Sequence, residues 1–216
     1  IAVDNDVTLT MLHSQATAET ITGAGSVIVT GTGATTVNLA NVTANIDISG
    51  VNSGGAITTL TYGTIGGSQT VTLTGAQASG KTISGTGTTI VKSLANDTNL
   101  ANVSTTNLTL QLAGDVTYTG SVHGTPAITL DTDNNTTARA IDITGGTFNP
   151  ASIAVDNDVT LTMLASQANG ETITGAGTVI VESLATTTNL TKANPTTLTL
   201  QLAADIPYTV TFNPGP

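Results

Sequence analysis

Cysteine and tryptophan are both missing from this chain, and only 2% of its residues are aromatic. Without cysteine, the fold has neither a disulfide framework nor thiolate ligands for a structural metal ion. A core with so few aromatic rings has to be built from aliphatic side chains, and 38% of the residues are hydrophobic. The absence of Trp and Cys also counts against a string of immunoglobulin-like sandwiches, in which a buried Trp packs against an inter-sheet disulfide.

Charged residues are scarce, and most of them are acidic. Lys and Arg together number 4, Asp and Glu number 14, and the net charge is −10. A nucleic-acid partner needs a basic groove that neutralises phosphates, so this composition argues against nucleic-acid binding. Of the two histidines, His13 and His123, the first is replaced by Ala165 in the matching repeat. Because a repeated scaffold rarely carries its catalytic base only once, and because few aromatic platforms are present for sugars, we expect a protein that is not an enzyme.

Long hydrophobic runs are also missing. No apolar stretch approaches the roughly 18 residues that indicate a transmembrane helix. The chain shows neither a signal peptide nor a lipidation motif, so we expect that this segment neither spans nor anchors in a membrane. Low charge and abundant hydroxyl groups suit a surface exposed to harsh conditions, and we therefore expect an extracellular or cell-surface location.

What the chain does contain is repetition. The decapeptide IAVDNDVTLT occurs at Ile1–Thr10 and again, unchanged, at Ile153–Thr162, and a weaker copy begins with VTLT at Val71. Self-similarity of this kind indicates a small structural unit that is stacked many times. We therefore expect one continuous array over residues 1–216. Its homologous units lie at about 1–70, 71–152 and 153–216.

A second repeated motif concerns the ends of the chain. The tetrapeptide TFNP occurs at Thr147–Pro150, shortly before the second decapeptide, and again at Thr211–Pro214. A decapeptide placed after Pro216 would continue the pattern. We expect the chain to be a piece of a longer tandem array in which such units join end to end.

The periodic segments have the composition and spacing of stacked β-strands. The β-branched residues Val, Ile and Thr dominate these segments, and apolar residues alternate with Thr or Gln, as in half-buried strands. The strand starts Val159, Val179 and Leu198 are spaced by 179 − 159 = 20 and 198 − 179 = 19 residues, about the length of one solenoid coil. The sequence thus predicts an all-β fold, a β-solenoid (β-helix) of roughly ten to twelve coils of about 20 residues. Tandem immunoglobulin-like β-sandwiches are the alternative, since they also give short strands separated by turns.

This architecture predicts the direction of individual side chains. Val179 should point into the core, whereas Thr160 should point outward. The glycines of the GAG motifs at Gly23 and Gly175 and of the GTG motif at Gly85 should form corners, where positive φ or close backbone approach is required.

Acidic residues in turns are the candidate metal ligands. Carboxylate and amide oxygens crowded on a turn suit Ca²⁺, although Asp and Asn are also favoured in turns without any metal. The candidates are Asp4, Asp6, Asp131, Asp133, Asp156 and Asp158, and Asn134 and Asn135 follow the second pair. Calcium is the one cofactor that we consider. We predict no catalytic or cofactor-binding residues.

The segments TLTL, ITGAGTVIV and TLTLQLA resemble the Thr/Gly-rich β-strand repeats of large bacterial surface proteins, the hemagglutinin-type adhesins and autotransporter passengers. The resemblance covers nearly the whole chain. It implies a secreted, elongated β-solenoid that projects from the cell as an adhesin, stalk or matrix fibre, and it carries over no site residues.

Three functional classes remain open. The first is a structural or adhesive repeat that self-associates end to end. The second is binding to ice or another crystal surface, suggested by outward T-x-T pairs such as those at Thr8 and Thr160. The third is recognition or cleavage of a glycan. In the second class every successive coil should carry the T-x-T pair, but coils that read VIVTG and VIVES interrupt it.

Overall fold

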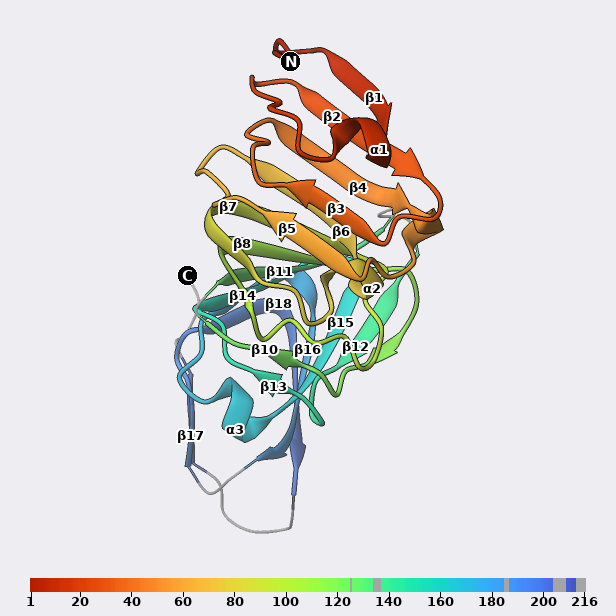
Figure 1. The fold of residues 1–216 in the computed structure, drawn as a ribbon. Helices are drawn as coiled ribbons and strands as arrows, with labels where there is room; N and C mark the ends of the chain where they lie inside the picture. The colour runs from red at the N-terminus through yellow and green to blue at the C-terminus, as the bar shows by residue number, and fades with distance from the viewer. Residues whose placement is uncertain (125, 134–136, 185–186, 204–208, 213–216) are drawn as a thin grey trace.

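The computed structural model shows a β-solenoid of about ten parallel stacked coils of about 20 residues (Figure 1). It describes residues 1–124, 126–133, 137–184, 187–203 and 209–212. Among these, all strand pairs are parallel, for example β1 with β2 and β7 with β8. The predicted β-solenoid is therefore confirmed, and the alternative of tandem sandwiches is wrong, because those sandwiches are built from antiparallel sheets.

The strands are β1 (Thr8–Leu12), β2 (Ser26–Gly31), β3 (Thr36–Leu39), β4 (Asn45–Val51), β5 (Thr59–Tyr62), β6 (Thr70–Thr74), β7 (Ile83–Lys92), β8 (Val103–Leu112), β9 (Val116–Thr117), β10 (Ser121–Val122), β11 (Ala127–Thr132), β12 (Arg139–Asp142), β13 (Thr147–Phe148), β14 (Ser152–Val155), β15 (Val159–Leu164), β16 (Ile173–Leu184), β17 (Thr187–Leu190), β18 (Ala193–Leu202) and β19 (Thr209–Phe212). Short helical turns are α1 (His13–Ala16), η1 (Asn52–Gly54), α2 (Gly75–Ala78) and α3 (Ala165–Ala168).

One long strand ladder runs from the N-terminal coil through most of the molecule. It passes through β1, β2, β4, β6, β7, β8, β11 and β14 and reaches the first part of β16. Val27 is paired with Ile46, which in turn is paired with Val71, and all three are buried. Inward aliphatic residues therefore stack directly on one another. Complete burial of each such side chain contributes about 1.5–3 kcal/mol before chain entropy is counted.

A second ladder forms another side of the later coils. It consists of β9, β12, β15, the last part of β16 and β18. Where it begins, the backbone carbonyl of Asn96 accepts a hydrogen bond from the N–H of Thr119 at 2.7 Å, and the side chain of Asn96 accepts one from Thr117. Asn96 thus satisfies donors at the start of the new ladder.

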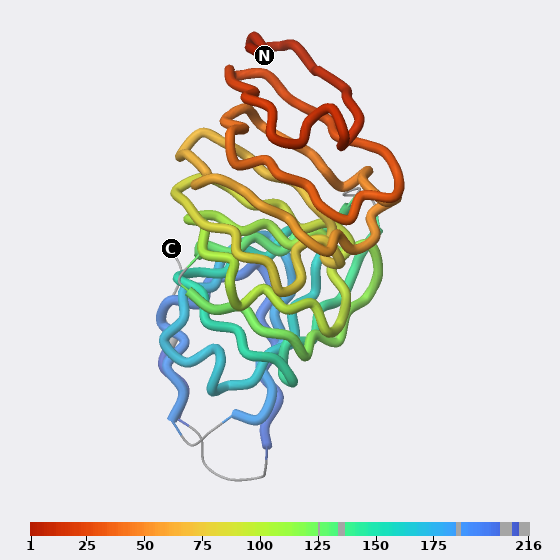
Figure 2. Tube along the Cα trace, viewed as in Figure 1, coloured from red at the N-terminus to blue at the C-terminus, as the bar shows by residue number. Residues whose placement is uncertain are grey.

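The strand β16 joins the two ladders into one 13-stranded sheet. Ile173, in its first part, pairs with Ile153 of β14, and Val179, in its last part, pairs with Leu161 of β15. The register shifts between Gly175 and Thr178, where the strand turns the corner. The ladder that begins at β1 thus continues along a different side of the later coils. The tube in Figure 2 shows that the coils of the N-terminal half are inclined to the coils of the C-terminal half.

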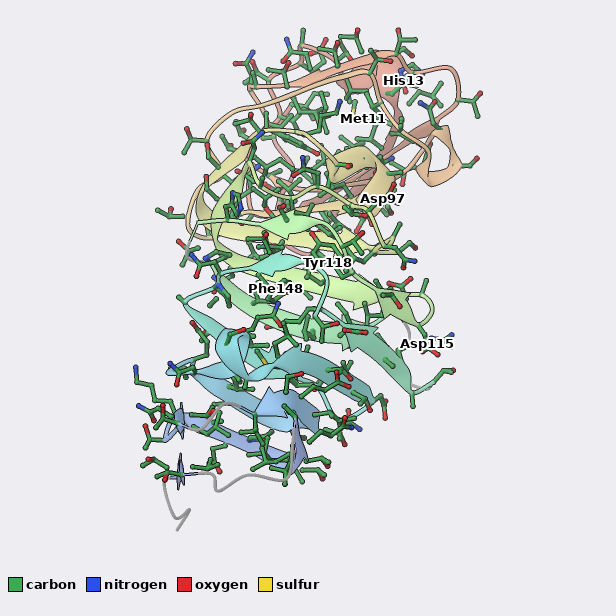
Figure 3. All side chains as sticks on the ribbon, turned by 90° about the horizontal axis from the view of Figure 1, so that it is seen from below. Met11, His13, Asp97, Asp115, Tyr118 and Phe148 are labelled. Atoms are coloured by element: carbon green, nitrogen blue, oxygen red, sulfur yellow. The ribbon has the colours of Figure 1, made fainter. Side chains whose placement is uncertain are left out.

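Short sheets close the coils opposite the long sheet. Strand β3 pairs with β5, β10 with β13, and β17 with β19, all in parallel (Figure 1). Inside the coils, between the long sheet and these short sheets, Tyr118 and Phe148 form an edge-to-face aromatic pair with ring centroids 6.1 Å apart. Figure 3 shows the two rings in the middle of the molecule.

The inside and outside assignments are confirmed. Val179 is fully buried, and Thr160 on the opposite face of its strand is partly exposed. Val179 pairs with Leu161, 179 − 161 = 18 residues earlier, and the same offset joins Leu9 to Val27 and Val71 to Thr89, so these strand pairs are closer in sequence by two residues than the spacing of 20 between Ile153 and Ile173. The cause lies in the corners, because the turn after Val155 uses more residues than the glycine corner in β16. A shift of two residues leaves the same side chains pointing inward.

The glycine corners are confirmed at the GAG and GTG motifs. Gly23, Gly85 and Gly175 have φ values of +110°, +141° and +113°. A Cβ atom at Gly175 would collide with the carbonyl of Val155 in the preceding coil. These positions therefore require glycine both for backbone conformation and for space.

Candidate functional site

The predicted acidic ligands of the decapeptide lie in two equivalent turns. The carbonyl of Asp4 accepts a hydrogen bond from the N–H of Val7 at 3.1 Å, and the carbonyl of Asp156 accepts one from Val159 at 2.9 Å. Asp6 has a positive φ of 65°, a conformation that Asp tolerates better than most residues. The backbones of these residues thus have a structural role in turning the chain at a corner.

In the later turn, the backbone also joins neighbouring coils. The N–H of Asp156 donates to the carbonyl of Leu130 at 3.0 Å, and the carbonyl of Asp158 accepts a bond from Arg139 at 2.8 Å. The carboxylate of Asp158 accepts a bond from Asn157 at 3.3 Å. The identical sequence at the N-terminal end has no preceding coil within the described residues.

The third acidic pair lies at the end of β11. The carboxylate of Asp131 accepts bonds from the Gln111 side chain at 3.2 Å and from the N–H of Thr132 at 2.7 Å. Asp133 accepts a bond from the Ser93 hydroxyl at 3.4 Å. The following Asn134 and Asn135 lie outside the described residues.

The structure does not gather these carboxylates into a larger cluster. Within the described ranges, no three His, Cys, Asp or Glu side chains lie close enough together to hold one metal ion. Calcium binding remains a prediction. It is tested by comparing thermal unfolding in calcium with unfolding in a chelator.

A more regular arrangement is formed by glutamine residues that the sequence reasoning missed. The fully buried Gln77, in α2, accepts a bond from the N–H of Thr74 through Oε1 at 2.9 Å. Its Nε2 donates to the carbonyls of Ile48 and Val51, each at 2.9 Å. Both acceptors belong to the preceding coil. Gln77 therefore caps its own helical turn and clamps two coils together.

The same clamp recurs in the third sequence unit. Oε1 of Gln167 accepts a bond from the N–H of Leu164 at 2.8 Å, and Nε2 donates to the carbonyls of Ile143 at 2.8 Å and Gly146 at 3.2 Å. Gln69 bridges coils similarly, from Nε2 to the carbonyls of Val42 and Ala44, each at 3.0 Å. A signal was present in the sequence, because S/A-Q-A follows each of the three aligned VTLT strands.

The first unit contains half of the clamp. Oε1 of Gln15 accepts a bond from the N–H of Leu12 at 2.9 Å, as in the other two units. Gln15 is exposed, and within the described part of the chain no acceptor lies in hydrogen-bonding range of its Nε2. Gln77 and Gln167, in contrast, donate from Nε2 to carbonyls of a preceding coil.

The N-terminal coil is uncovered in other respects. Ile1 and Val7 are 58% and 50% exposed, whereas the equivalent Ile153 and Val159 are each 1% exposed. The strands that contain Ile153 and Val159, β14 and β15, pair with β11 and β12 of the preceding coil. Figure 3 places Met11 and His13 in this end coil.

The outward face of the second ladder carries a row of threonines. Thr160 pairs with Thr178, which pairs with Thr197. The parallel row reads Thr162, Ile180 and Thr199. The predicted interruption of the T-x-T pattern is thus confirmed on this face.

Two tyrosines stand out among the ionisable groups: Tyr118 is fully buried, and Tyr62 is partly buried with its hydroxyl inside. Burial raises the pKa of Tyr118 well above its usual value, and its hydroxyl donates to the carbonyl of Thr98 at 2.7 Å. Burial, with a contribution from Asp47, raises the pKa of Tyr62 still further. Both hydroxyls stay protonated at neutral pH, and that of Tyr118 is fixed by its hydrogen bond to Thr98.

No protein-family model, curated protein sequence or solved structure matches the chain. In the part of the chain that the structure describes, no helix combines the length and the hydrophobicity needed to cross a membrane.

Proposed function

We propose that the chain is a non-enzymatic structural or adhesive repeat whose task is to provide reach and stiffness. The observation that carries this proposal is the continuous stack of coils around one aliphatic core. Each coil adds another layer of ladder hydrogen bonds and buried side chains to the one before it, so stability grows along the stack. Glutamine clamps such as Gln77 add hydrogen bonds between successive coils.

The proposal includes an extracellular or cell-surface location, as a bacterial adhesin, stalk or matrix fibre. It also includes end-to-end self-association as the main partner interaction. The acidic composition and the scarcity of basic residues argue against nucleic acid as a partner. The solenoid fold supports the resemblance to adhesin repeats at the level of architecture.

Single-molecule stretching tests the mechanical part of the proposal. We expect the chain, pulled from its two ends, to resist force and then to lose its coils in steps. Extension at low force without such resistance would contradict a load-bearing role.

Binding to ice or to a glycan surface is a second candidate, favoured by the threonine row of Thr160, Thr178 and Thr197. Inhibition of ice recrystallisation that is lost in Thr178→Val would support a lattice-matching face. Binding to a polysaccharide panel would support glycan recognition. If the chain is inactive in both assays, the structural or adhesive repeat remains as the single proposed function.

A further inference from the structure

A groove lies on one side of the solenoid, beside a strand edge that has no partner. Its walls are residues 58–64, which include β5, and residues 80–82 and 84 of the following coil, and its volume is about 510 Å³. Among the described residues, β5 pairs only with β3. The segment on the other side of β5 forms no strand at residues 79–82. The edge of β5 that faces this β5 groove is therefore open.

The register of the β3–β5 pair shows which backbone groups of β5 are free. The N–H of Thr59 donates to the carbonyl of Thr35 at 2.9 Å, so Thr59 and Thr61 bond to β3. In a parallel ladder, alternate residues direct both their N–H and their C=O groups to the same neighbour. Leu60 and Tyr62 therefore direct theirs toward the groove, where no described residue bonds to them. A strand edge of this kind is a template for another strand.

The inward side chains of β5 are also incompletely covered. Val37 and Leu39 of β3, which lie beside β5, are 0% and 1% exposed. Their partners in β5, Leu60 and Tyr62, remain partly exposed. Within the molecule, the element that covers such an edge is a strand in which apolar residues alternate with Thr. A second strand of that kind, placed in the groove, would cover Leu60 and Tyr62.

The groove carries a positive charge, although the net charge of the chain is −10. Lys81 is the single charged residue among those that line it. Nζ of Lys81 donates to the carbonyl of Thr58, just before β5, at 2.9 Å. The equivalent residues of the other two units are Glu19 and Glu171, in the aligned segments ETIT, KTIS and ETIT. The second unit thus replaces an anion with a cation, and this charge favours an anionic partner.

We infer that the β5 groove binds an extended acidic peptide of a partner protein, which adds to β5 as a parallel strand and places a carboxylate at Lys81. This inference rests on the adhesive role proposed above and specifies a partner for it. The free backbone groups of Leu60 and Tyr62 pair with the backbone of the peptide, and their side chains select apolar residues at alternate positions. A peptide fits better than a polysaccharide, because only a peptide backbone repeats N–H and C=O groups at the spacing of a strand.

The probe is a synthetic peptide, acetylated and amidated, with the sequence of residues 157–164, NDVTLTML. It combines an acid, Asp158, with the alternating segment that follows it. Isothermal titration calorimetry on the full chain should show saturable binding at one site. Lys81→Glu should weaken binding at least about fivefold, because it replaces an ion pair with a repulsion. Since this variant restores the residue of the other two units, it should keep the fold.

Two controls separate the contact at Lys81 from a general effect of charge. Lys192→Glu, at an exposed position, changes the net charge equally and should bind the probe like the wild type. A probe with Asp158→Asn should bind the wild type more weakly, and Lys81→Glu should then have little further effect. Equal weakening by Lys81→Glu and Lys192→Glu would overturn the proposed contact.

Methylation of single peptide nitrogens in the probe tests strand addition itself. Every second N–H of an added strand points toward β5, and the N–H groups between them point away. Methyl groups placed one at a time on residues 159–162 of the probe should therefore alternate in effect. Two should weaken binding at least about tenfold, through a lost hydrogen bond and a steric clash, and two should have little effect. A uniform effect at all four positions, or none, would overturn strand addition.

Two further outcomes would overturn the inference. One is the absence of binding up to about 1 mM probe, the range of a very weak complex. The other is binding of the acidic polysaccharide polygalacturonate that Lys81→Glu weakens while the peptide shows no such dependence, because the groove would then recognise a glycan.

Failure of this inference can be told from failure of the proposed function. A chain that resists stretching but does not bind the probe would overturn only the peptide site. A chain that binds the probe but extends without resistance would overturn the load-bearing role and leave the site in place.

Discussion

The glutamine clamp makes a sharp prediction about stability. Gln77→Glu preserves the shape of the side chain and its acceptor for the N–H of Thr74, but it removes both donated bonds to Ile48 and Val51. Each lost hydrogen bond costs about 1 kcal/mol. The fully buried position also places a carboxylate against two carbonyl oxygens with no compensating cation among its hydrogen-bond partners.

We therefore expect a total loss of roughly 3–5 kcal/mol in the free energy of unfolding. That is a large part of the roughly 5–15 kcal/mol available to a typical domain. Urea denaturation followed by circular dichroism measures the loss. Gln15→Glu is the matched control, because Gln15 makes the same local bond but is exposed. Its unfolding free energy, measured on dilute monomer, should change by less than about 0.5 kcal/mol.

The pH dependence gives a second readout of the same variant. Burial raises the pKa of the introduced carboxyl above its unfolded value of about 4.3. The protonated carboxyl of Glu can again donate a hydrogen bond. The loss in the free energy of unfolding should therefore be smallest below about pH 4.3 and should grow as the pH rises toward the pKa of the folded state. Equal losses in the two variants, or a loss independent of pH, would refute the clamp.

Three other substitutions or titrations test the fold. Gly175→Ala should cost roughly 3 kcal/mol in urea denaturation, and more than Gly170→Ala, where φ is also positive but the space is open; equal costs would contradict the corner contact. Val179→Asp should cost more than about 4 kcal/mol and Thr160→Ala less than about 1 kcal/mol, and similar values would contradict the inward and outward assignment. Tyr118 should stay protonated in an ultraviolet titration until the protein unfolds. Because burial raises its pKa, stability should fall as the pH rises above about 10, where the unfolded chain ionises, and ionisation at that pH without unfolding would contradict its burial.

The stacking of parallel strands could be predicted because repetition and β-branched alternation point to the same architecture. The inward direction of Val179 followed from alternation alone. The register did not, because the corner after Val155 is longer than the glycine corner in β16, and sequence spacing does not show where a corner takes up extra residues.

The sequence also did not predict that the first ladder moves to a different side of the coils at β16. Ile1 and Ile153 begin identical decapeptides, yet Ile1 is exposed and Ile153 is buried. Which ladder a strand joins depends on its contacts with the preceding coil, and the residues of that coil are distant in sequence. The glutamine clamps were visible as repeated S/A-Q-A segments, but only the coordinates show that Gln77 reaches the carbonyls of another coil.

Electron microscopy of the purified chain across concentration tests the central claim most directly. Ten coils spaced by about 4.8 Å give one copy an axial length of about 50 Å. We predict short rods of that length in dilute solution and filaments of uniform width at high concentration, with lengths that increase by whole copies. Beaded strings or compact globules would contradict a continuous solenoid that extends through its ends.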